Sequence, residues 1–299
     1  MEAISKFPYT HQPLRSISLP TRVHPFSHRV EALLNHLKPH HSQSFSSNIC
    51  LDAETIQSDL LVLAELYNCM EELFHSPQAQ QALVHYQDGK LVEDALCGSV
   101  TLLDACGSAR DLLMVLKEHV QSLQSAIRRR KGDSSIESSI SAYDSFRKKA
   151  KKEISKQFGK LKRMENKVNF NISLISQDQQ LIFLAKVLRE ASSITISILC
   201  SLLLFISMPA LRITKGSSLI SKLKPTRLFS SQKNSNELQC VDAALSTLLK
   251  DGTNVDKMQA ARQKLEALED ATESLENNLE SVFRLLIKTR ASFLNIMTQ

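Results

Sequence analysis

Apolar side chains recur at steps of three and four residues along most of the chain, which is the spacing of one face of an α-helix. The run from Ile56 to Phe74 follows this spacing, and Pro77 closes it. Helices are predicted on this basis at residues 27–38, 52–76, 77–86, 92–127, 135–168, 178–207, 237–250 and 258–296. Pro39 is expected to end the first of them. The pattern predicts an all-α fold, a bundle of long antiparallel, coiled-coil-like helices.

The first 50 residues carry little of this periodicity, apart from their one short helix. They are predicted to form a largely irregular N-terminal segment, residues 1–50, in front of a helical bundle domain, residues 51–299. In the last helix, apolar residues alternate in steps of three and four from Met258 to Ile296. Such sustained heptads predict a helix packed along a seam, either inside this chain or between two chains.

Two glycines and one long apolar stretch add detail to this picture. Gly98 and Gly107 lie inside the helix at 92–127, where they are expected to let a neighbouring helix approach closely. Residues 191–211 carry no charge between Glu190 and Arg212. This length suits either a central helix buried in the bundle or a segment in contact with a membrane.

The net charge of +6 is unevenly distributed along the chain. Residues 51–127 hold twelve acids and three bases, a net of −9, whereas residues 128–167 hold fourteen bases and five acids, a net of +9. One interpretation is that two antiparallel helices face each other with complementary charges. The other is that the basic surface is free to meet anionic lipid, nucleic acid or an acidic protein.

A lysine-rich run within the basic stretch is the first candidate site. Lys148, Lys149, Lys151 and Lys152 are predicted to contact an anionic surface. Nucleic acid is not favoured as the partner, because no nucleic-acid-binding motif is present and the aromatic residues that could stack on bases belong to the apolar line of the helix. These aromatic residues are Tyr143, Phe146 and Phe158.

A second candidate site lies near the N-terminus. The stretch from Arg15 to Pro20, with Ser16 and Ser18, fits the pattern R-S-x-S-x-P that 14-3-3 proteins read in phosphopeptides. Arg15 stands three residues before Ser18, as basic-directed kinases favour, and phosphate on Ser18 would supply acceptor oxygens for an arginine cluster. The sequence therefore predicts that Ser18 is a regulated docking site.

Catalytic chemistry has no support in the sequence. There is no glycine-rich phosphate loop, no G-x-S-x-G and no H-E-x-x-H, and none of the six cysteines forms a C-x-x-C pair. We therefore expect a protein that is not an enzyme and has no metal, cofactor or small-molecule substrate. Scattered cysteines and the lack of a secretory segment favour a reducing compartment, hence a cytoplasmic protein that is either free or membrane-associated.

Several motifs in order resemble a plant family. They are "RSISLPTRVHP", "LLDACGSARDLL", "VQSLQSAIRRRKG", "KKAKKEISK" and "LREASSITISILCSLLLFIS". Together they are similar to the plant domain of unknown function 241 family, which includes the Bypass (BPS1-like) proteins of root and shoot development. The resemblance implies an all-helical plant protein with no known enzymatic activity and a role in development, and the family offers no catalytic residues to carry over.

Two functions remain open at this point. The first is a helical interaction protein that acts in root and shoot development through protein partners. The second is a peripheral membrane protein, attached through the lysine-rich helix at 147–167 and through the apolar segment at 191–211.

Overall fold

Every secondary-structure element that the computed structural model describes is an α-helix, which confirms the predicted all-α fold. The structure describes residues 25–41, 52–85, 90–129, 133–168, 178–207, 236–251 and 254–298. The helices are α1 (Pro25–His41), α2 (Ala53–Phe74), α3 (Pro77–His85), α4 (Lys90–Arg128), α5 (Asp133–Val168), α6 (Gln179–Ser207), α7 (Glu237–Asp251) and α8 (Val255–Met297).

Short polar side chains define where several helices begin. The Asp52 carboxylate accepts a hydrogen bond from the Thr55 backbone N–H at 2.7 Å, which caps α2. Asn254 caps α8 in the same way. At the start of α7, Asn236 and Gln239 each accept a hydrogen bond from the backbone N–H of the other, which is the reciprocal pattern of a capping box.

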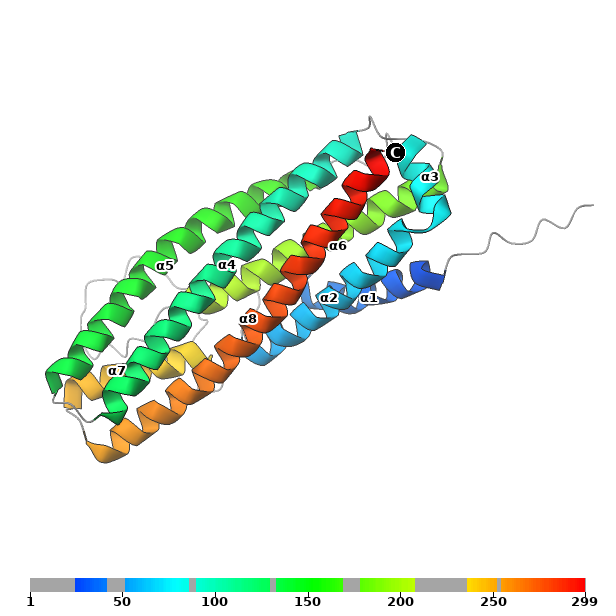
Figure 1. Cartoon of the computed structure of the whole chain (residues 1–299). Helices are drawn as coiled ribbons and strands as arrows, with labels where there is room; N and C mark the ends of the chain where they lie inside the picture. Colours follow the sequence, from blue (N-terminus) through cyan, green and yellow to red (C-terminus); the bar gives the residue numbers. More distant parts are fainter. Residues whose placement is uncertain are drawn as a thin grey trace, which may run out of the picture.

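The helices form an elongated bundle in which successive long helices alternate in direction (Figure 1). Helix α8 packs against α2, α4 and α7, and α6 packs against α1, α2, α3, α4 and α5. Helices α2 and α8 are distant in sequence but lie side by side and run parallel. Two hydrogen bonds show the direction: Gln57 donates to the Ala271 carbonyl, and further along both helices Ser292 donates to Glu71. Helix α4 runs antiparallel to α8 on its other side (Figure 1).

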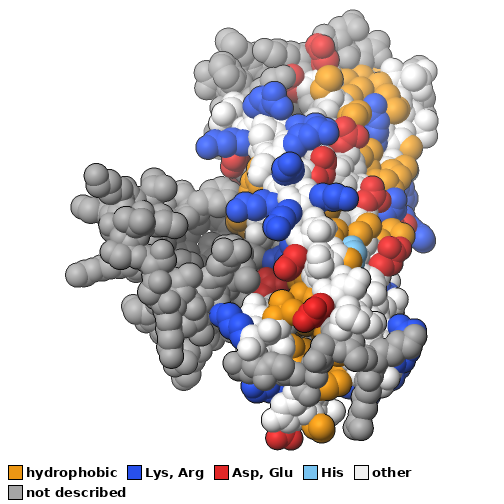
Figure 2. Space-filling view, turned by 90° about the vertical axis from the view of Figure 1, so that its left-hand side faces the viewer, with side chains coloured by type: hydrophobic (Ala, Val, Ile, Leu, Met, Phe, Trp, Pro, Cys, Tyr) orange, Lys and Arg blue, Asp and Glu red, His pale blue; other side chains and the backbone are white. Residues whose placement is uncertain are grey.

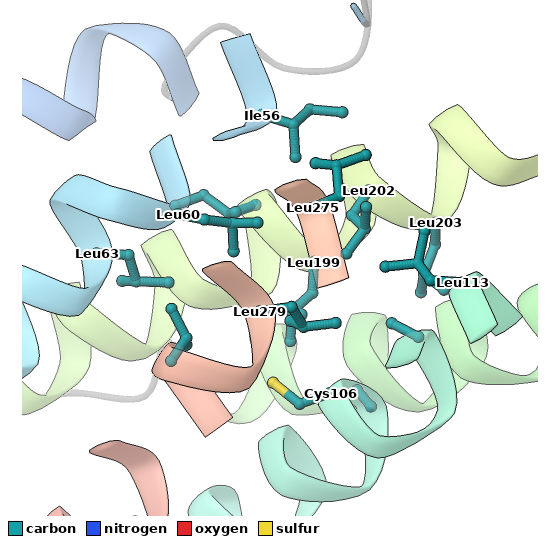
Figure 3. Close-up of a cluster of buried hydrophobic side chains, with 14 of the residues drawn as sticks. Ile56, Leu60, Leu63, Cys106, Leu113, Leu199, Leu202, Leu203, Leu275 and Leu279 are labelled. Carbon is teal, nitrogen blue, oxygen red and sulfur yellow. The ribbon is translucent and has the colours of Figure 1, made fainter. Parts of the chain in front are cut away.

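The heptad line of α8 is buried inside this chain. Its buried positions are Ala261, Leu265, Leu268, Thr272, Leu275, Leu279, Val282, Leu286, Thr289, Phe293 and Ile296. Leu275 and Leu279 point into a cluster with side chains from α2, α4 and α6 (Figure 3). The seam predicted from the heptads is therefore an intramolecular one, filled by α2 and α4.

Helix α1 is longer than the sequence predicts. It begins at Pro25, a position where proline is well tolerated because the first helical N–H has no partner in the helix anyway. It also continues through Pro39 to His41. The expectation that Pro39 ends the helix is wrong, since a proline this close to the C-terminal end removes a hydrogen bond from the last turns only.

The two glycines of α4 behave differently. A Cβ atom on Gly98 would lie 2.9 Å from Cε of Met164 on α5, which confirms the close approach predicted there. A Cβ atom on Gly107 would meet nothing within 4 Å, so the prediction for Gly107 is wrong. The second glycine instead leaves open space at the surface of the bundle.

Candidate anionic-surface contact site

The core of the bundle determines where the lysine run of α5 points. Ala150 and Ile154 are buried, on the same line as Ile140 and Tyr143. Each residue of a helix is turned by about 100° from the one before it, so the positions on either side of Ala150 point away from the core. Lys148, Lys149, Lys151 and Lys152 are exposed as a result, and we call these four residues the lysine face.

The lysine face has no counter-charge among the residues that the structure describes. None of its four ammonium groups forms an ion pair with a residue that the structure describes. The carboxylate nearest to it in sequence, Glu153, instead accepts a hydrogen bond from Gln157 at 2.8 Å and lies 3.7 Å from the Lys156 ammonium. Lysine and arginine side chains gather on the side of the molecule that Figure 2 shows.

Arg147 belongs to the same run in the sequence but not to the exposed surface. Its guanidinium lies 3.2 Å from Asp242 of α7 and also donates to the carbonyl of Ile206, near the C-terminal end of α6. The Tyr143 hydroxyl donates to the other oxygen of Asp242 at 2.7 Å. The side chains of Arg147 and Asp242 are 13% and 8% exposed, so this cluster joins α5, α6 and α7 in the interior.

Burial dominates the titration of this cluster. Loss of hydration raises the pKa of Asp242 above its ordinary value, although Arg147 and Tyr143 act in the opposite direction. Burial also raises the pKa of Tyr143, with the Asp242 charge adding to the effect.

The Ile206 carbonyl, which accepts from Arg147, lies in the last turn of α6. Helix carbonyls have no partner in their own helix there, and a cation is favourable. The cluster therefore has a structural role in holding α7 to the bundle.

The acidic and basic stretches of the sequence are largely not paired with each other. Helices α4 and α5 do pack together, but the ion pair between them among the described residues is that of Lys160 with Asp104, at 3.8 Å. The bases of α4 turn to α8 instead, where Arg110 bonds to Glu280 at 2.7 Å and Lys117 lies within 4 Å of two carboxylates. The basic side chains Arg110 and Lys117 of α4 therefore form their ion pairs with carboxylates of α8, the last helix.

The apolar segment at 191–211 belongs to α6 as far as Ser207, and residues 208–211 lie outside the described part of the chain. By length and composition, α6 is the one described helix that could cross a membrane. Within the bundle, however, 61% of its most apolar window is buried, by contacts with five other helices. The bundle thus accounts for the apolar character of α6 as a core helix.

The structure does not test the predicted docking motif near the N-terminus. Arg15, Ser16, Ser18 and Pro20 lie outside the described residues, so the docking motif stays a prediction. Among the residues that the structure does describe, no group of three or more histidine, cysteine, aspartate or glutamate side chains is placed to hold a metal ion.

Fold and surface together define an all-helical bundle protein with an exposed lysine face on α5. The family model described as Protein BPS1 matches residues 59–296, and the chain belongs to this family. The resemblance seen in the sequence motifs is thereby confirmed, and membership suggests a role in plant development. No curated protein and no solved structure matches the chain. Helix α1 and the first turns of α2 lie before the matched region.

Proposed function

We propose that the protein is a non-catalytic, cytoplasmic interaction protein that attaches to an anionic membrane surface through the lysine face of α5. The observation that carries this proposal is the exposure of four neighbouring lysines with no ion-pair partner among the described residues. The packed core on the opposite side of α5 holds their backbone in place. An anionic surface would supply the counter-charge that the described residues do not provide.

Lipid is favoured over nucleic acid by the chemistry around the lysines. Proteins that bind single-stranded nucleic acid combine basic residues with exposed aromatic side chains on which bases stack. Here Tyr143 and Phe146 are buried and Phe158 is half-buried against the core. A lipid headgroup layer requires only positive charge at the right distance, and the lysine face offers this.

The experiment is co-sedimentation of the full chain with vesicles of phosphatidylcholine, with and without phosphatidylserine. We expect binding only to the anionic vesicles and release by salt, because salt screens exposed charges. Changing the four lysines of the lysine face to glutamine should weaken the partition by about a thousandfold at low salt, at about one kcal/mol per lysine.

A matched control removes four positive charges elsewhere. Arg129, Lys186, Lys250 and Lys264 are exposed on other parts of the bundle, and their replacement by glutamine should weaken binding much less. Unchanged binding of the lysine-face variant would contradict the proposal. Binding that survives high salt would indicate attachment through the apolar segment instead, and tighter binding to duplex DNA would favour nucleic acid as the partner.

A further inference from the structure

A small cavity lies inside the bundle where α2, α4, α6 and α8 meet, near the end of the bundle at which α2 and α8 both end (Figure 1). Its volume is about 50 Å³. Most of its wall is apolar and includes the buried side chains of Met70, Leu102, Leu286 and Phe293. A cavity with such a wall can hold the apolar part of a small molecule.

One polar atom in the wall of this cavity has no partner. Thr289 lies on the buried heptad line of α8 and is 8% exposed. Its hydroxyl oxygen is buried and forms no hydrogen bond with any residue that the structure describes. Buried polar groups nearly always have a partner in folded proteins, because an unpaired one costs folding free energy. A ligand in the cavity would supply the missing partner of the Thr289 hydroxyl.

The next residue along α8, Arg290, brings a positive charge to the same cavity. One nitrogen of its guanidinium donates to the Leu96 carbonyl and to the Ser99 hydroxyl, and Ser99 itself donates to the same carbonyl. These bonds hold the half-buried guanidinium against α4. Its other two nitrogens have no partner among the described residues, and no described carboxylate pairs with it. The Arg290 charge is therefore available to a ligand.

These groups together define the chemistry of the ligand. A guanidinium binds a carboxylate through two parallel hydrogen bonds, and the Thr289 hydroxyl can donate to a carboxylate oxygen as well. The apolar wall favours an organic anion over an inorganic one, since it offers an inorganic ion no compensation for lost hydration. At about 10–15 Å³ for each water-sized group, the cavity has room for about three to five such groups.

We infer that this cavity is a binding site for a short-chain monocarboxylate of the size of propionate. The carboxylate binds Arg290 and the hydroxyl of Thr289, and the alkyl end lies among the apolar side chains of the wall. The inference concerns binding and not catalysis. It does not depend on the proposed membrane attachment, because that attachment uses the lysine face of α5, and the cavity lies between other helices.

The experiment is a saturation-transfer NMR titration of the full chain with propionate, and with propionamide as a neutral ligand of the same size. We expect propionate to bind with a dissociation constant in the millimolar range, because so small a ligand makes few contacts. Propionamide should bind at least about tenfold more weakly, because it forms no charge-assisted hydrogen bonds with Arg290. Arg290→Met should weaken propionate binding by at least about tenfold for the same reason. Arg262→Met is its control, since Arg262 lies on the same helix but pairs with Glu266.

A valine at position 289 tests the hydroxyl without changing the shape of the side chain. Thr289→Val should weaken propionate binding by about tenfold, because it removes one buried hydrogen bond to the ligand. Thr272→Val is the matched control and should leave binding unchanged. Thr272 is buried on the same heptad line, but its hydroxyl donates to the Leu268 carbonyl at 2.7 Å and does not line the cavity.

The stability of the valine variants without ligand gives a second measurement. Thr289→Val should unfold at a higher urea concentration than the parent chain, because it removes an unpaired buried hydroxyl, whereas Thr272→Val should not. A lack of saturable propionate binding would overturn the inference, and so would propionamide binding as tight as that of propionate. Unchanged propionate binding by Thr289→Val or by Arg290→Met would do the same. A Thr289→Val chain less stable than the parent would also overturn it, since the hydroxyl would then already have a partner within the chain.

Discussion

At the scale of single residues, the structure separates side chains that fill the core from those that only follow the same spacing. Leu275 and Leu279 are fully buried on α8 between α2, α4 and α6 (Figure 3). Leu249 of α7 has a similar place in the periodic pattern of its own helix but is 48% exposed. The free energy that each leucine contributes should differ accordingly.

We predict that Leu279→Ala lowers the free energy of unfolding by about 2–5 kcal/mol, because it removes buried methyl groups and leaves a cavity. Leu275→Ala should have an effect of the same size. Leu249→Ala is the control and should change the stability by less than about 1 kcal/mol. Urea unfolding followed by circular dichroism measures all three. If the α8 variants unfolded at the same denaturant concentration as the parent, their seam could not be the core of the bundle.

Asp242 gives the protein a pH dependence whose sign can be stated. Its pKa is raised above the ordinary value of 3.8, chiefly by burial. The folded chain therefore holds this proton more tightly than the unfolded chain does. The contribution of Asp242 to stability is greatest below 3.8 and is lost as the pH rises through its raised value in the folded state.

We therefore expect the stability of the parent chain, measured relative to Asp242→Asn, to fall as the pH rises from about 4 toward neutrality. The asparagine side chain has a similar shape and does not titrate, so other ionisable groups largely cancel in the comparison. Urea unfolding of both proteins over a series of pH values provides the measurement. A difference that stayed constant, or grew with pH, would contradict the assignment of the raised pKa.

At the scale of elements, the glycines of the long helices differ in what surrounds them. Alanine is preferred to glycine inside a helix by about 1 kcal/mol, provided that the added methyl group has room. A Cβ atom on Gly159 of α5 would meet nothing within 4 Å, whereas one on Gly98 of α4 would lie 2.9 Å from Met164. The two positions form a natural comparison.

We predict that Gly159→Ala raises the free energy of unfolding by about 0.5–1 kcal/mol. Gly98→Ala should give a smaller gain or a loss, because Met164 has to move before the methyl group fits. Guanidinium chloride unfolding resolves differences of this size. Equal gains at the two positions would mean that α4 and α5 are not in close contact at Gly98.

The sequence predicts the helices well, because a helix that buries one face needs apolar residues at every third or fourth position. It predicts their partners less well, because the acids that meet Arg110 and Lys117 lie on α8, far along the chain. Arg147 could have been separated from the lysine face, since it follows Tyr143 by four residues and so shares its inner line. The partner of Arg147, Asp242, could not be predicted, because nothing in the sequence indicates that α5 and α7 are in contact.

At the scale of the whole molecule, the two basic features of α5 have different tasks. Arg147 is directed inward and holds α6 and α7, while the lysine face is directed outward. The outward lysines are thus free of the packing that fixes Arg147, which is why we assign the proposed membrane contact to them alone.

The central position of α8 also has a consequence for how the protein is made. The ribosome delivers α2 and α4 long before α8, yet both helices are buried against it in the finished bundle. The apolar faces of α2 and α4, and part of the strongly apolar α6, stay uncovered until α8 has been translated. During that interval the nascent chain exposes the kind of surface that chaperones hold. Completion of the core therefore requires that α8 has been translated, and chains truncated before α8 cannot close their own interior.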